Sequence, residues 1–438
     1  MRFISSRSNN PDQQVPFSEA VLKCFPSDGG LYVPAYAEDL SPWINYMTEE
    51  TSFTSMAGSL TQALIKEEFS PIISEAIATS AFPFSPKLRR LDDNLYVLEL
   101  FHGPTGCYKD FGISYLAACM DHMLLMKNKK ATVLAVTNGE TGACIANAFR
   151  GRKNLKAVLF FTKGATRGFA KEDMIQNGGN ILPIEVDSDT ESAFQMVRKI
   201  YAQPELVEKY GLTLANTVNI GRVLPLVFCY VYAFSRLKSK TVGSIYYSGY
   251  AGNLGNIAAG LYAWKFALPL NGFITNTTSD LILDQMDKCK LMDSVVPLRQ
   301  RGIADVAKPS NVERIEEVFH DSPAVLKGLV FPANVYEEDQ ERACKDAFMK
   351  YGYMMDGETA SAWAAARKRS DLVDEYDGSV VLLARNDPSL SQHDIRHWCG
   401  EAPELSDKLF NVYMPRDPAK TIPPDVDAAV SVMREFLD

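Results

Sequence analysis

Short apolar runs alternate with helical patterns between residues 95 and 384. Runs such as LAVT and VLFFT are continuously apolar, which is typical of strands buried on both faces of a parallel sheet. Because strands and helices alternate, the pattern predicts an α/β fold with parallel sheets. The predicted strands are Leu95–Phe101, Ala131–Thr137, Ala157–Thr162, Ile181–Val186, Ser244–Ser248, Phe273–Thr275 and Val380–Ala384. The predicted helices include Ile113–Met126, Ala143–Arg150, Glu191–Ala202 and Asn256–Phe266.

Residues 1–92 differ from the rest of the chain in composition and in hydrophobic pattern. They are rich in Ser, Pro and Thr, and they carry three short helical patterns, Phe17–Phe25, Ser55–Ile65 and Pro71–Ala81. We interpret them as an N-terminal helical extension that packs on a larger body. Polar, basic breaks near residues 128 and 236 divide that body. We expect a large α/β unit from 93–128 and 225–438, a small α/β unit from 129–224, and a ligand cleft between them.

Composition and charge exclude several classes of protein. The chain has 438 residues, of which 46% are hydrophobic and 23% are charged, and its net charge of −9 argues against nucleic-acid binding. The longest apolar run, Leu224–Phe234, is shorter than the ~20 residues of a membrane-spanning helix. The N-terminus lacks the apolar stretch of a signal peptide. Eight cysteines without a CxxC pair predict reduced, buried thiols in a cytoplasmic protein.

No metal site is predicted. His393 and His397 have the i, i+4 spacing of zinc ligands, but their segment is polar and offers no third ligand. We therefore expect a surface helix there.

The segment FHGPTGCYKDFG places Lys109 at the start of a helix, directly after a Gly-Pro turn. The helix dipole and burial beside aromatic residues would lower the pKa of the Lys109 amine. A neutral amine is what Schiff-base chemistry requires. The alternative is an exposed lysine whose stem covers apolar surface.

Two glycine-containing loops follow predicted strands and open helices. The first contains Thr137, Asn138, Gly139, Glu140 and Thr141, and its amides suit a carboxylate or phosphate. An ordinary strand–helix turn explains it equally well.

In the second loop, Gly252, Asn253, Leu254 and Gly255 can present successive amides to a phosphate, with Asn256 next in the chain. Arg222, beside an apolar helix, is a candidate for an anion site or for a structural salt bridge.

Six segments taken in order resemble the threonine synthase family, which are fold-type-II enzymes dependent on pyridoxal 5′-phosphate (PLP). The resemblance covers most of the chain. The segments are VPFSEAVLKCFPSDGGLYVP, FHGPTGCYKDFG, TNGETGA, LANTVNIGRVLPLVFCY, SGYAGNLGNIAAG and ADVAKPSNVERIEEVF. The second is close to the family's cofactor-lysine motif, FHGPT-x-x-FKDFG.

The resemblance implies a tryptophan synthase β-like fold and a role for each segment. Lys109 would bond PLP and move protons. Residues 252–256 would hold the cofactor phosphate, and Glu140 would also lie at the cofactor. Thr137, Asn138, Gly139, Thr141 and Arg222 would bind substrate. The implied reaction converts O-phospho-L-homoserine and water to L-threonine and phosphate. The implied partner is therefore a small phosphorylated amino acid, and the implied assembly is a monomer or a homodimer.

One stretch departs from the family pattern. The family carries GTAHPAKF, where this chain has Arg385-Asn386-Asp387-Pro388. Arg385 then replaces the threonine expected to bond the pyridine nitrogen, which would keep that nitrogen unprotonated and weaken the electron sink. Two alternatives follow. The protein is either a phospho-lyase that releases 2-oxobutanoate, ammonia and phosphate from O-phosphohomoserine or O-phosphothreonine, or a catalytically degenerate PLP-binding protein.

Overall fold

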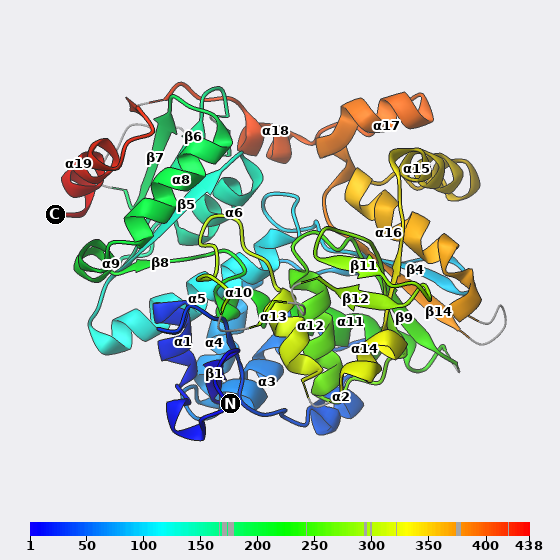
Figure 1. Ribbon diagram of the computed structural model, residues 1–438. Coiled ribbons are helices and arrows are strands. Elements are labelled where there is room, and N and C mark those ends of the chain that lie inside the picture. The colour runs from blue at the N-terminus through cyan, green and yellow to red at the C-terminus, as the bar shows by residue number, and fades with distance from the viewer. Residues whose placement is uncertain are drawn as a thin grey trace.

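The computed structural model describes residues 1–438 except 166, 169–172, 174–178, 242, 293–295, 298, 299, 321, 374–377 and 419. Two separate sheets lie side by side (Figure 1). The larger has six strands in the order β13-β10-β9-β14-β4-β3, and the smaller has five in the order β15-β7-β6-β5-β8. The expected α/β architecture with two sheets is therefore confirmed.

The larger sheet is parallel except for β3, which pairs antiparallel with β4. Alternate residues of its central strand β14 face opposite layers: Val381 and Leu383 join one core cluster, and Val380 and Leu382 join another. Its strands are β3 (Lys87–Asp92), β4 (Leu95–Glu99), β9 (Ile245–Ser248), β10 (Gly272–Asn276), β13 (Val330–Ala333) and β14 (Ser379–Ala384). The helices near it are α5 (Lys109–Lys127), α11 (Leu226–Leu237), α12 (Gly255–Lys265), α13 (Val312–Val318), α14 (Pro323–Leu329), α15 (Glu337–Tyr351), α16 (Gly357–Lys368) and α17 (Gln392–Cys399). A hairpin of β11 (Leu281–Leu283) and β12 (Cys289–Leu291) completes this part.

The smaller sheet is entirely parallel. Its strands are β5 (Ala131–Thr137), β6 (Leu155–Thr162), β7 (Ile181–Val186), β8 (Leu212–Thr213) and β15 (Thr421–Ile422). The helices around it are α6 (Glu140–Phe149), α8 (Thr190–Tyr201), α9 (Pro204–Tyr210) and α19 (Val426–Leu437), while α10 (Ile220–Val223) packs against α5, α11 and α12 and α18 (Asp407–Tyr413) precedes β15. The predicted bounds of β5 and β7 agree with the structure.

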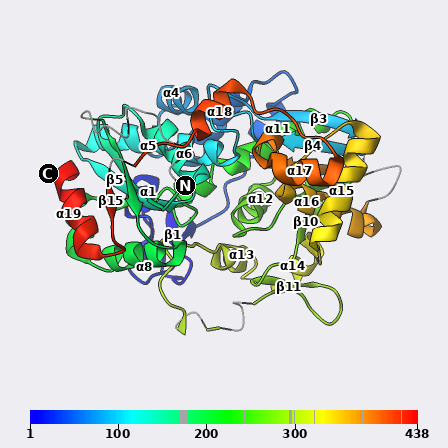
Figure 2. The same cartoon turned by 90° about the horizontal axis from the view of Figure 1, so that it is seen from above.

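The C-terminal segment returns to the smaller sheet. Strand β15 pairs with β7, and α19 packs beside α8 (Figure 2). The sequence-based division kept all of 225–438 with the larger unit, so it differs from the structure here. The reason is that so short a strand has no periodicity to read, and its partner lies in a distant part of the sequence.

The N-terminal residues form the expected extension, with helices α1 (Phe17–Lys23), α2 (Ser41–Tyr46), α3 (Phe53–Ile65) and α4 (Pro71–Ala81). Two short strands that were not predicted, β1 (Phe3–Ser5) and β2 (Tyr32–Pro34), pair antiparallel. Helix α4 packs on α3 and α5, which fixes the extension to the main body. The last strand of the predicted extension, β3, belongs to the larger sheet.

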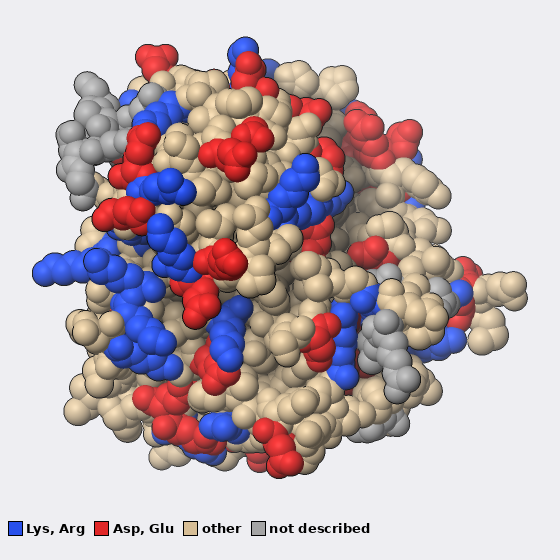
Figure 3. Space-filling model, turned by 60° about the vertical axis from the view of Figure 1, so that its left-hand side comes forward, with Lys and Arg blue, Asp and Glu red and all other residues tan. Residues whose placement is uncertain are grey.

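Among the described residues, Ile220–Leu237 is long and apolar enough to cross a membrane, but 94% of it is buried inside the protein. It is therefore a core helix segment. The cysteines are free thiols, and all but the partly exposed Cys399 are buried, as predicted. Helix α17 carries the two histidines, and the His393 side chain is 97% exposed. On the face drawn in Figure 3, basic and acidic side chains lie interspersed.

Candidate active site

Lys109 is the first residue of α5, and the segment that leads to it is held from several sides. Asp110 accepts hydrogen bonds from the amide of Thr105 at 2.8 Å and from its hydroxyl at 3.0 Å. Gly103 permits this turn, because a Cβ there would lie 2.3 Å from the Asp110 carboxylate. The Tyr108 amide donates to the Arg385 carbonyl at 2.7 Å. The segment after β4 is thus tied to the end of β14.

The Lys109 ammonium forms an ion pair with Glu140, with Nζ 2.7 Å from Oε2. The sequence-based expectation of a lowered pKa for Lys109 is wrong. Burial alone would lower that pKa, but the Glu140 carboxylate beside the ammonium helps to raise it well above its usual value. Because Lys109 and Glu140 lie far apart in the sequence, the helix-dipole argument could not include this carboxylate.

The loop after β5 uses some of its amides internally. The Thr137 hydroxyl accepts from the amides of Gly139 at 3.0 Å and Gly142 at 2.8 Å. Gly139 has a φ of 130°, in the region that favours glycine. The amides of Asn138 and Thr141 have no acceptor among the described residues. This loop can therefore offer an anion only part of the amide set that the sequence predicts.

The loop between β9 and α12 also uses some of its amides in internal hydrogen bonds. The Leu254 amide donates to the Ala251 carbonyl at 2.7 Å, and the Gly255 amide donates to the Asn253 side chain at 3.2 Å. Two of the four amides predicted to bind phosphate are therefore already used. The amides of Gly252, Asn253 and Asn256 have no acceptor within the described chain. They lie at the N-terminus of α12, where the helix dipole favours negative charge.

Two side chains outside the predicted set hold this loop. The Thr217 hydroxyl accepts from the amide groups of Asn253 and Asn311, each at 2.9 Å. Asn311 also donates to the Asn253 carbonyl at 3.0 Å. Thr217 and Asn311 lie in the segments LANTVNIGR and KPSNVER, so the motifs were recognised but these two positions were not singled out.

Arg222 and Arg385 bring positive charge to the site. Arg222 is 3% exposed, and its Nη1 atom has no acceptor in the described part of the chain. Gly112 makes room for it, because a Cβ there would lie 1.8 Å from Nη1. Arg385, at the end of β14, is 6% exposed. Its Nη1 atom lies 3.0 Å from Oε2 of Glu358, and its Nε atom has no acceptor among the described residues.

Part of the predicted set lines a single cavity, whereas Gly252, Leu254, Gly255, Asn256 and Arg385 are not among its lining residues. One cavity of about 230 Å³ is lined by Lys109, Thr137, Asn138, Thr141, Arg222 and Asn253, together with Asn216 and Thr217. Gly139 and Glu140 join it through the loop and the ion pair. Arg385 lies over the ring of Tyr108, 4.1 Å from its centroid. Glu358 replaces a histidine of the family's D-P-H-T-A segment but was not among the predicted site residues, and no local pattern marks it as the partner of Arg385.

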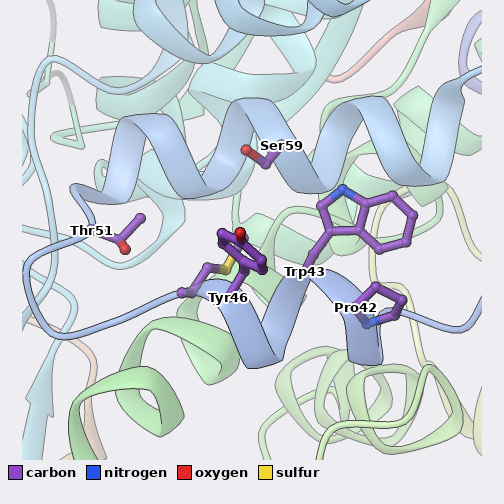
Figure 4. A pocket seen from close by; sticks show the side chains of 6 residues that line it. Pro42, Trp43, Tyr46, Thr51 and Ser59 are labelled. Atoms are coloured by element: carbon purple, nitrogen blue, oxygen red, sulfur yellow. The ribbon is translucent and has the colours of Figure 1, made fainter.

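A second cavity, of about 410 Å³, lies in the extension (Figure 4). It is lined by Pro42, Trp43, Tyr46, Met47, Thr51 and Ser59. That lining contains no charged side chain, so the cavity lacks the acid–base groups found around Lys109.

PLP fits the donor set around Lys109. The cofactor has an aldehyde for an amine, a phosphate for unused amides, and acceptors for buried N–H groups. Lys109 would supply the amine and the free amides of 252, 253 and 256 would hold the phosphate, while Arg385 Nε and Arg222 Nη1 are buried donors without an acceptor among the described residues.

Comparison with known proteins agrees with this chemistry. A family model described as "Pyridoxal-phosphate dependent enzyme" matches residues 74–384, and one described as "Threonine synthase N terminus" matches residues 2–82. The chain is 30% identical to threonine synthase of Haemophilus influenzae over 81% of this chain and 82% of that protein. It is 28% identical to threonine synthase of Escherichia coli over 93% and 94% of the two chains.

Solved structures of threonine synthases also resemble this chain. The E. coli threonine synthase structure superposes with a TM-score of 0.81 at 26% identity, covering 99% of this chain and all of that one. A PLP-bound threonine synthase from Brucella melitensis, at 22% identity, shares the fold with a TM-score of 0.83 over 100% of this chain and 99% of that one. Fold and site together define a PLP-dependent enzyme of fold type II. Within that class, the chain belongs to the threonine synthase family.

Proposed function

We propose that this protein converts O-phospho-L-homoserine and water to L-threonine and phosphate, with PLP bonded covalently to Lys109. The observation that carries this proposal is the cavity itself. It joins the Lys109 amine to a buried arginine with an unpaired donor and to two partly unused amide loops. A substrate with a carboxylate and a phosphate needs several separate anion contacts, and the arginine and the free amides at this cavity would provide them.

PLP supplies an electron sink for carbanions formed on the substrate. The protein supplies orientation and proton transfer. Residues 137–141 would hold the substrate carboxylate through the free amides of Asn138 and Thr141. Arg222 would pair with the substrate phosphate and stabilise the charge that develops as phosphate leaves. Lys109 Nζ would give and take protons at the substrate carbons, while Glu140 keeps a negative charge 2.7 Å from that nitrogen.

The test is a product assay on purified, PLP-loaded protein with O-phosphohomoserine. Phosphate, threonine and 2-oxobutanoate are each quantified, and Lys109→Ala serves as the control that must lose turnover. Threonine equal to the phosphate released supports the proposal. A folded, PLP-loaded protein that releases no phosphate would refute it and favour the degenerate alternative.

A second candidate function is phosphate elimination that gives 2-oxobutanoate and ammonia. The observation that favours it is Arg385, a permanent cation with donors only, which lies buried against Tyr108 beside Lys109. Elimination without water addition has fewer steps, and for O-phosphothreonine, whose phosphate is on Cβ, it requires removal of only the Cα proton and makes a smaller demand on the electron sink. Phosphate release matched by 2-oxobutanoate, without threonine, supports this candidate.

A further inference from the structure

Arg385 lies between Lys109 and residues 252–256, the two segments that a bound cofactor would have to bridge. In the larger sheet, β14 pairs in parallel with β4 on one side and β9 on the other. Lys109 follows β4, and residues 252–256 follow β9. A cofactor bonded to Lys109 with its phosphate on residues 252–256 must therefore cross the carboxyl end of β14. The first residue after β14 is Arg385.

The guanidinium of Arg385 is held on two sides and open on a third. It lies 4.1 Å from the ring centroid of Tyr108 and 5.3 Å from that of Tyr250. Its Nη1 atom would lie 3.5 Å from a Cβ on Gly252, so it reaches the edge of the phosphate loop. Its Nε atom is buried without an acceptor among the described residues. A buried guanidinium N–H without a partner is costly, which indicates that a ligand supplies the acceptor.

Glu358 fixes this arrangement. It lies in the first turn of α16, where the Asp356 side chain caps the helix by accepting from the Glu358 amide at 2.9 Å and the Thr359 amide at 3.2 Å. The Glu358 carboxylate accepts from Asn386 at 3.3 Å and pairs with Arg385 Nη1 at 3.0 Å. The ion pair offsets the cost of burying the Arg385 charge. Because Glu358 occupies Nη1, the Nε–H remains available for another acceptor.

We propose that Arg385 Nε–H donates a hydrogen bond to the ring nitrogen of PLP and that Glu358 is the positioning residue that holds Arg385 for this contact. An arginine has no acceptor, so the ring nitrogen must offer its lone pair and stay unprotonated. This inference rests on the proposed attachment of PLP to Lys109. It adds a residue pair that sets the electronic state of the cofactor in this chain.

The direct test is the ¹⁵N spectrum of wild-type protein loaded with PLP labelled at the ring nitrogen. Protonated and unprotonated pyridine nitrogens give well-separated resonances. We expect the unprotonated resonance at pH 7.5. A protonated ring nitrogen overturns the inference. This measurement needs no variant, so it decides the question even if a substitution at the buried Arg385 prevents folding.

Variants then assign the two roles. Arg385→Thr should move the ¹⁵N resonance and weaken PLP binding about 10- to 100-fold, the range expected for a hydrogen bond to a charged group. Glu358→Gln should move the resonance in the same direction, Glu358→Asp should restore it, and the double variant should match Arg385→Thr. An unchanged resonance in Arg385→Thr overturns the contact, and one in Glu358→Gln overturns the positioning role. Arg367→Thr is the matched control, because Arg367 lies on α16 with Glu358 and its exposed ion pair is with Asp346 of α15.

Failure of this inference is distinguishable from failure of the proposed function. Wild-type protein that makes threonine but carries a protonated ring nitrogen refutes only the Arg385 contact. Protein with an unprotonated ring nitrogen that makes no threonine refutes only the proposed product.

Discussion

The Lys109–Glu140 ion pair should hold the lysine protonated and thereby slow its reaction with PLP. At an effective dielectric constant of about 20, unit charges 2.7 Å apart attract by ~6 kcal/mol. The Glu140 side chain is 40% exposed, so solvent screening reduces this to about 3 kcal/mol. Divided by 1.36 kcal/mol per pH unit, that energy corresponds to a rise of about 2 units in the Lys109 pKa.

Glu140→Gln should therefore shift the pH profile of covalent PLP loading by about 2 units toward lower pH. Where loading is limited by the free amine, the variant should load about 100-fold faster than wild type at the same pH. PLP is first removed, then added back. Loading is followed over time by borohydride trapping and mass spectrometry of the Lys109 peptide.

Two control variants accompany this experiment. Glu140→Asp keeps the charge and should retain much of the wild-type profile. Glu191→Gln, which removes an exposed carboxylate paired with Arg198 on α8, should leave the profile unchanged. Slower loading of Glu140→Gln at every pH would refute the reasoning, because it would mean that the carboxylate acts as the proton acceptor for Lys109 and not as a restraint on it. An unshifted profile would refute it as well.

Three further predictions concern the supports of the site. Burial raises the pKa of Asp110 to about 6, so its contribution to stability is complete below the unfolded value of about 3.9 and is lost as the pH rises through 6. Relative to Asp110→Asn, the free energy of unfolding of wild type should fall by about 2 kcal/mol between pH 4 and pH 7 in urea titrations; a constant difference would contradict this. Gly112→Ala should collide with Arg222 and destabilise the protein by about 1–3 kcal/mol in thermal unfolding, whereas Gly328→Ala, with open space around it, should not. Thr217→Val leaves two asparagine amides without their shared acceptor and should weaken PLP binding about tenfold in a fluorescence titration; unchanged affinity would show that this hydroxyl does not support the phosphate loop.

Much of the fold could be read from local patterns. The bounds of β5, β7 and α4 agree with the prediction, because a continuous apolar run or a helical period is a property of neighbouring residues. The C-terminal strand β15 could not be found in this way. It is very short, and it exists because β7 offers a free edge. Its pairing reassigns the end of the chain to the smaller sheet.

The candidate site also has features that adjacent residues predict and features that they do not. The motif around Lys109 and the two glycine loops were identifiable, since turns, caps and helix starts depend on adjacent residues. Which amides stay free was not identifiable. Thr137 takes two amides of one loop, and the neighbours of Leu254 and Gly255 take two of the other. These bonds depend on the backbone conformation of each loop, so more amides were predicted to bind an anion than are free to do so.

The sequence by itself determined the class of protein, the lysine that bears the chemistry, and the departure at Arg385. Only the tertiary structure decided the charge state around them. Glu140 and Glu358 are each distant in the sequence from the cation that they pair with, yet each carboxylate lies within 3.0 Å of its partner. Electrostatic interactions depend on separation in space and on burial, neither of which follows from spacing along the chain.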